Sequence, residues 1–130
     1  MICALAFFEI VVNNFDVMLE WYTQILGFRL KGEIIFNEDG RWCQLMTSDG
    51  DGRLALWKPS DPSKTPDPGG KIRPSFFPIF EVQDLYSFVE RLKASKKVKM
   101  LEPIRERVGY RITTIADPEE NQLQLYEKRI

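Results

Sequence analysis

Histidine is absent from this chain of 130 residues. Its absence removes the commonest metal ligand, the usual general base near neutral pH, and every Ser-His or Cys-His nucleophile pair. Cysteine is scarce, because Cys3 and Cys43 are the only two copies, and this number is too small for a disulfide framework. The sequence therefore predicts two buried free thiols in a reducing cytoplasm.

Excess charge and long apolar runs are also missing. The formal net charge of −1 gives no electrostatic reason to expect nucleic acid or an anionic membrane as a partner. No apolar run is long enough to cross a bilayer. The apolar beginning, MICALAFFEIVV, has no basic leader and contains Glu9. It predicts a buried strand rather than a signal peptide, in a cytoplasmic chain whose length suits one domain.

One stretch, residues 7–28, sets the plan of the chain. Alternating side chains predict a strand up to Val12, and Asn13 and Asn14 then predict a helix cap. Gly27 can adopt the left-handed conformation that ends a helix. Between these points lie apolar residues at helical spacing, namely Phe15, Met18, Trp21, Tyr22, Ile25 and Leu26.

The same plan occurs a second time in residues 76–93, where Asp84 is the expected helix cap. The correspondence continues beyond the helix, because Leu54–Trp57 aligns with Leu123–Tyr126 at nearly the same offset. The sequence therefore predicts an internal duplication.

Each copy is completed by further strands, bounded by turn-forming residues. In the first copy they are expected at 28–36, 42–47 and 53–58, and in the second copy at 98–102, 104–108, 110–116 and 122–128. We expect one domain over 1–130, with unit one over about 1–58, a linker over about 59–74 and unit two over about 75–130. The linker is dense in Pro, Gly, Ser and Asp, and is either a passive connector, a flap over a site or a crossover between subunits.

This ordered set of motifs resembles the vicinal oxygen chelate superfamily, which includes glyoxalase I, extradiol dioxygenases, and fosfomycin- and bleomycin-resistance proteins. The resemblance covers nearly the whole chain and is carried by Asn13–Phe28, Glu81–Asp84, Gly109–Arg111 and Asp117–Asn121. It implies an α+β fold in which two tandem βαβββ units form a curved, cleft-bearing mixed sheet with helices on the outer face. It also implies a homodimer. Glu120 stands where the family usually has Gly, which predicts a local difference in that turn.

The resemblance also implies which positions would hold a metal. The family's metal enzymes place ligands on four strands, at the positions of Phe7, Ala55, Phe77 and Gln124 in this chain. Three of these side chains have no donor atom, and one amide oxygen cannot hold a divalent transition metal. The chain is therefore expected to lack a metal site and to use no cofactor.

A cleft without a metal would be lined by the strand residues that alternate with the core. Trp57 and Tyr126 would stack on a ligand or pack at the rim, and Glu9 would either pair with Arg53 or hold a polar group of the ligand. Trp42 is included as a candidate, although strand parity leaves its side open. The other candidates are Phe7, Ala55, Phe77, Ile79, Gln122 and Gln124.

Three functions remain open at this point. The leading hypothesis is a metal-independent binding protein for a small, partly aromatic or apolar molecule. A second is a cofactor-free isomerase or lyase in which Glu9 is the general acid/base, and its catalytic residues are otherwise unknown. A third is a non-catalytic dimeric interaction module. None of the three involves nucleic acid or a membrane.

Overall fold

The computed structural model describes residues 1–65 and 77–129. The chain divides into two compact units, Met1–Gly70 and Lys71–Ile130, called unit 1 and unit 2 below. Each unit has its own sheet and few helices, which confirms the predicted α+β class. No helix within the described residues is long and apolar enough to cross a membrane. Most of the predicted linker, residues 66–74, lies outside the described residues.

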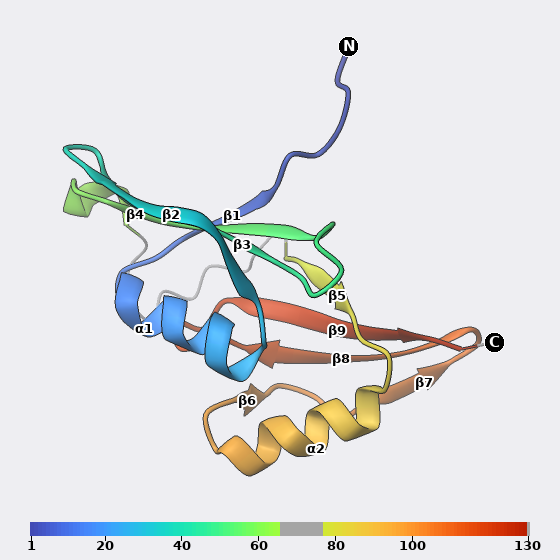
Figure 1. Cartoon of the computed structure of the whole chain (residues 1–130). Helices are drawn as coiled ribbons and strands as arrows, with labels where there is room; N and C mark the ends of the chain where they lie inside the picture. Colours follow the sequence, from blue (N-terminus) through green and yellow to red (C-terminus); the bar gives the residue numbers. More distant parts are fainter. Residues whose placement is uncertain (66–76, 130) are drawn as a thin grey trace. The chain divides into compact units, whose positions relative to one another are not determined.

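The described part of unit 1 forms a four-stranded sheet of order β1-β4-β3-β2 (Figure 1). Strand β1 (Phe8–Val11) runs parallel to β4 (Arg53–Pro59). Strands β2 (Arg29–Asn37) and β3 (Gly40–Met46) form an antiparallel hairpin, and β3 is antiparallel to β4. The predicted strands are confirmed to within a residue or two.

Helix α1 (Phe15–Glu20) begins where the sequence predicts, because Asn14 Oδ1 accepts a hydrogen bond from Val17 N at 3.1 Å. The helix continues as a π-helical turn over Trp21–Ile25, which apolar spacing alone does not reveal. Gly27, with φ +83°, ends it as predicted. The two consecutive aromatic residues of this turn, Trp21 and Tyr22, are both buried.

The prediction of a buried strand is wrong for residues 1–7. These residues are exposed, and Figure 1 shows them leading away from the sheet. The reason is the length of the neighbouring strand: Phe8 pairs with Leu54, and β4 begins at Arg53, so earlier residues have almost no strand to pair with. Cys3 is consequently exposed, which corrects the prediction of two buried thiols. Cys43 is buried, and burial raises the pKa of its thiol to about 11.

The described part of unit 2 contains a sheet of order β5-β9-β8-β6, with β7 also paired to β8. Its strands are β5 (Ile79–Glu81), β6 (Lys99–Met100), β7 (Arg105–Arg107), β8 (Tyr110–Ala116) and β9 (Gln122–Lys128). The two strands expected on either side of Pro103 are shorter than predicted, since proline has no N–H to donate to a ladder. Helix α2 (Leu85–Ser95) is capped by Asp84, as predicted, whose Oδ1 accepts from Ser87 N at 3.1 Å.

The two units repeat the same strand order and register. Glu9 lies opposite Ala55 in unit 1, and Ile79 lies opposite Gln124 in unit 2. This is the correspondence on which the predicted duplication rests. Strands β6 and β7 together take the place of β2, whose pairing is itself irregular between Lys31 and Ile35.

The core of each unit lies on the sheet face that its helix covers. In unit 1 this face carries the fully buried Leu45, Leu54 and Leu56, and in unit 2 it carries Ile115 and Leu123. The alternation predicted from the sequence therefore assigns the core correctly. The opposite face of each sheet, which we call the site face, carries the residues predicted to contact a ligand.

Candidate functional site

An open cavity of ≈ 570 Å³ lies at one end of the site face of unit 1. Trp42 and Trp57 line it, and they lie opposite each other in the register of β3 and β4. This pairing settles the side on which Trp42 lies: it shares the face of Trp57. The rest of the lining comes from the β2 end, the hairpin turn and the start of the linker, namely Ile35, Asn37, Glu38, Asp39, Pro59, Ser60, Asp61 and Lys64.

Trp57 packs against the backbone of the β2–β3 hairpin. Gly40 has φ +145°, and a Cβ on it would lie 2.2 Å from the Lys58 carbonyl oxygen and 2.8 Å from Cη2 of Trp57. No side chain fits at this point without moving backbone or the indole, so glycine allows the ring to lie close to the hairpin. The position of Trp57 is therefore built into the strand pairing.

Trp42 is held from a different direction. Its indole Nε1–H donates to Glu9 Oε1 at 3.2 Å, and the Phe7 ring meets it edge to face with centroids 5.9 Å apart. Glu9 and Phe7 were both predicted to line the site, and the structure gives them contacts with Trp42. Glu9 thereby orients one wall of the cavity.

The Glu9–Arg53 ion pair considered from the sequence is not formed within the described residues. Glu9 lies beside Ala55 in the register, whereas Arg53 is exposed at the start of β4 and lies opposite Met46. The indole N–H of Trp42 takes the place of the guanidinium as the partner of Glu9.

The mouth of the cavity is acidic. The Ser63 hydroxyl and backbone N–H both donate to Asp61, and these hydrogen bonds lower the pKa of that carboxyl. Asp61 is therefore ionised at neutral pH. It also begins the short 3₁₀ turn Pro62–Lys64, so the first residues of the predicted linker form part of the cavity wall.

The site face of unit 2 differs from that of unit 1. Gln124 Nε2 donates to Thr114 Oγ1 at 3.3 Å, and Thr114 Oγ1 donates to Glu102 Oε1 at 2.6 Å. The same Glu102 oxygen accepts from Arg105 at 3.2 Å, so these polar groups largely satisfy one another. Tyr126 lies against the ring of Tyr110 at 5.7 Å. The remaining predicted residues of this unit, Phe77, Ile79 and Gln122, are exposed.

The residues at the family's metal positions do not fit a metal ion. Phe7 and Ala55 in unit 1, and Phe77 in unit 2, offer no donor atom, and the Gln124 amide is engaged with Thr114. The chain between its described limits, 1–65 and 77–129, contains no group of three or more His, Cys, Asp or Glu that could hold a metal.

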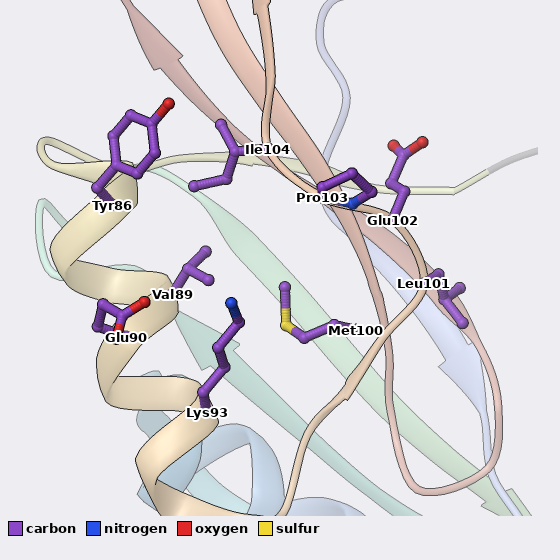
Figure 2. A pocket seen from close by; sticks show the side chains of 9 residues that line it. All are labelled: Tyr86, Val89, Glu90, Lys93, Met100, Leu101, Glu102, Pro103 and Ile104. Carbon is purple, nitrogen blue, oxygen red and sulfur yellow. The ribbon is translucent and has the colours of Figure 1, made fainter.

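A second cavity, of ≈ 580 Å³, lies on the helix side of unit 2. Figure 2 shows Tyr86, Val89, Glu90 and Lys93 of α2 along one side, and the segment Met100–Ile104 along the other. None of the predicted site residues lines this groove. The Tyr86 hydroxyl donates to Glu106 at 2.9 Å, and this bond raises the pKa of Tyr86.

The sequence alone does not predict most of the lining of the unit 1 cavity. It predicts a hairpin turn at Glu38 and Asp39 and a linker at Pro59–Lys64, and assigns neither to a site. One signal was available: this turn and the start of the linker flank Trp42 and Trp57 in the sequence. Antiparallel pairing of β3 and β4 brings such flanking segments to the same end of the sheet.

The comparison with protein families shows which superfamily the chain belongs to. The model described as Glyoxalase/Bleomycin resistance protein/Dioxygenase superfamily matches residues 4–125. The chain therefore belongs to this superfamily, which confirms the resemblance drawn from the motifs. A search of the curated proteins found no match.

Solved structures with the same fold cover nearly all of the chain. A glyoxalase family protein from Bacillus cereus is 18% identical with a TM-score of 0.76, covering 98% of this chain and 95% of that one. TnmS3, an antibiotic binding protein from a Streptomyces species, is 20% identical with a TM-score of 0.76, covering 98% of each. The fosfomycin resistance protein FosX from Listeria monocytogenes is 16% identical with a TM-score of 0.73, covering 100% and 97%. At these identities the likeness shows the fold alone.

Proposed function

We propose that this chain binds a small, partly aromatic molecule in the unit 1 cavity and does so without a metal. The observation that carries the proposal is the pair Trp42 and Trp57, which share one face and line a cavity of ≈ 570 Å³. That volume suits a small ligand, and two indoles offer flat apolar area with polar edges. The similarity to TnmS3, an antibiotic binding protein, and to FosX, a fosfomycin resistance protein, supports a role in handling small molecules.

The site lies mainly on unit 1 in this proposal. Trp57 and Trp42 supply the stacking surfaces, and Glu9 and Phe7 fix Trp42. Ala55, which lies opposite Glu9 in the register, is fully buried. Arg53 remains a predicted contact. The alternative location is the site face of unit 2, which carries the other residues predicted from the sequence, namely Phe77, Ile79, Gln122, Gln124 and Tyr126. The predicted homodimer also stays a prediction, which light scattering on the purified chain would test.

The contact of Glu9 with Trp42 favours binding over acid–base catalysis. Glu9 does not itself line the cavity: its carboxylate oxygen accepts from the Trp42 indole, and a general base would have to give up that bond to take a substrate proton. We therefore assign Glu9 a positioning role. A turnover assay with Glu9→Gln distinguishes the roles, because a general base would lose its reaction entirely.

The test begins with a screen of small planar aromatic molecules by ligand-observed NMR. For any ligand found, Trp57→Ala is expected to weaken binding by about 2 kcal/mol or more, which is about 30-fold, because a large contact area is lost. Tyr126→Ala is the matched control in unit 2 and is expected to leave affinity nearly unchanged. Affinity should also survive dialysis against a chelator.

Two outcomes would contradict the proposal. If Trp57→Ala binds as tightly as the parent chain and Tyr126→Ala does not, the site lies on unit 2. If dialysis against a chelator abolishes binding and a divalent metal restores it, the metal-independent part of the proposal is wrong.

A further inference from the structure

The mouth of the unit 1 cavity carries an excess of negative charge. Among the described residues, the carboxylates of Glu38, Asp39 and Asp61 line it, against the single ammonium of Lys64. From this charge, taken together with the two indoles, we infer that the ligand is an organic cation: an aromatic molecule that bears an amine or quaternary ammonium group. This inference rests on the function proposed above and specifies the chemistry of the ligand.

The basic residues nearest to the cavity in the sequence do not neutralise this charge. Arg41 pairs with Asp16 at 3.2 Å and lies over the Phe15 ring, on the helix side of the sheet. The Lys58 ammonium donates to the Asn13 carbonyl oxygen at 2.7 Å, also beside the start of α1. Both residues alternate with those of the site face, so the pleat directs their charges away from the cavity.

The carboxylates at the mouth are available to a ligand. Within the described residues, neither Glu38 nor Asp39 forms an ion pair, and both are exposed. Asp61 is held in place by Ser63, and its charge is maintained by the same bonds. Charged groups at an exposed mouth contribute modestly to affinity, but they discriminate strongly between ligands of opposite sign.

The two tryptophans point to the same chemistry. Indole is the aromatic side chain that attracts cations best, through the negative faces of its ring system, and aromatic walls beside carboxylates suit ammonium groups. A neutral aromatic ligand would use only the apolar contact area, and an anionic one would meet repulsion. In unit 2 the position equivalent to Ile35 is Arg105, so the corresponding surface there does not favour a cation.

The experiment compares three probes that share one ring system and differ in charge: naphthylethylamine, naphthylethanol and naphthylacetate. We expect the amine to bind about threefold more tightly than the alcohol, and the acetate to bind most weakly. Added sodium chloride should reduce the advantage of the amine, because exposed charges are screened. Dissociation constants from saturation-transfer NMR give the comparison directly.

Substituted variants test whether the acidic side chains at the mouth are the source of the preference for the amine. The double substitution Glu38→Gln with Asp39→Asn should make the amine and the alcohol bind about equally. Glu33→Gln is the matched control, because Glu33 is an exposed acid of β2 that does not line the cavity.

The outcomes distinguish this inference from the proposal beneath it. If the three probes bind with equal affinity and Trp57→Ala weakens all of them, the binding site stands and the preference for a cation is wrong. If the double variant keeps the full advantage of the amine, the acidic mouth is not its source and the inference fails. If none of the probes binds the parent chain, the proposed function fails and this inference fails with it.

Discussion

Arg41 in unit 1 and Arg111 in unit 2 occupy the same place in the duplicated plan. Each is the second residue of its strand, and in register they lie opposite Lys58 and Glu127 respectively. Arg41 lies over the Phe15 ring at 5.4 Å, and Arg111 lies over the Tyr86 ring at 5.0 Å. Both rings belong to the first turn of the helix in that unit. The duplication therefore extends to a side-chain contact that joins sheet and helix.

The site faces of the two units have diverged although their registers agree. The row Trp57, Trp42 and Ile35 in unit 1 corresponds to Tyr126, Ile112 and Arg105 in unit 2. The first row is apolar, with two indoles, and lines a cavity, whereas Arg105 of the second is bound to Glu102. The comparison teaches that strand pairing fixes where a side chain points, and that the residue type alone decides what it can bind.

The helix sides differ in how they are filled. In unit 1, Trp21 meets Tyr22 at 5.0 Å and Tyr22 meets Phe28 at 5.9 Å, and all three are buried. In unit 2 the side chains between α2 and residues 100–104 leave a groove of ≈ 580 Å³. Unit 1 is thus well packed on its helix side and has its cavity on the site face.

The largest expected effect tests the packing of unit 1. Trp21→Ala removes a ring that is 4% exposed and leaves a cavity in the core. The free energy of unfolding should fall by about 3–5 kcal/mol, measured by chemical denaturation. Trp57→Ala is the control, with a smaller loss expected because the ring borders an open cavity. Equal losses would mean that Trp57 belongs to the core.

The next largest effect on stability is expected at Glu127, which lies opposite Arg111, and is compared with Lys58, which lies opposite Arg41. Glu127 is 8% exposed, accepts from Leu85 N at 2.7 Å and pairs with Arg111 at 2.7 Å. Glu127→Gln removes a charged acceptor and places an amide donor among donors, so we expect a loss of about 1.5–3 kcal/mol. Its counterpart Lys58 is exposed, and Lys58→Gln should change stability by less than about 0.5 kcal/mol. If Lys58→Gln lost more stability than Glu127→Gln, the proposed difference between the two units at this position would be wrong.

The smallest expected effect on stability concerns two equivalent turns, at Gly50 in unit 1 and at Glu120 in unit 2. Gly50 has φ +82° and Glu120 has φ +64°, and the N–H of each donates to a carbonyl three residues earlier, at 2.9 Å. The turn at Glu120 thus has a left-handed conformation although it lacks a glycine. Glu120→Gly should raise stability by about 0.5 kcal/mol, and Gly50→Ala should lower it by about 1 kcal/mol. Thermal denaturation of both variants measures these changes in stability. A loss of stability in Glu120→Gly would contradict the idea that the backbone at Glu120 is strained.

Much of the fold could be predicted because its signals are local. Asn14 and Asp84 cap their helices through their own side chains, and Gly27 ends α1 through its own backbone. Alternation then assigned the core face of β4 and β9 correctly. The exposure of residues 1–7 could not be predicted, because it depends on where the distant strand β4 begins.

The candidate site was less predictable because it depends on register. The side on which Trp42 lies follows from the pairing of β3 with β4, which places it opposite Trp57 and which alternation within β3 cannot reveal. The partner of Glu9 likewise depends on register: Trp42 of β3 reaches it across β4, whereas Arg53 lies at the start of β4 opposite Met46. Residues Glu38 and Asp61 joined the site only through the meeting of two turns.

The most direct test of the central claim uses the three tryptophans of the chain as reporters. Each indole N–H gives one signal in a proton–nitrogen correlation spectrum, and single Trp→Phe variants assign the three signals. On titration with naphthylethylamine, the account predicts that the signals of Trp42 and Trp57 shift while that of buried Trp21 stays in place. Binding that leaves Trp42 and Trp57 unmoved would contradict the assignment of the site to unit 1.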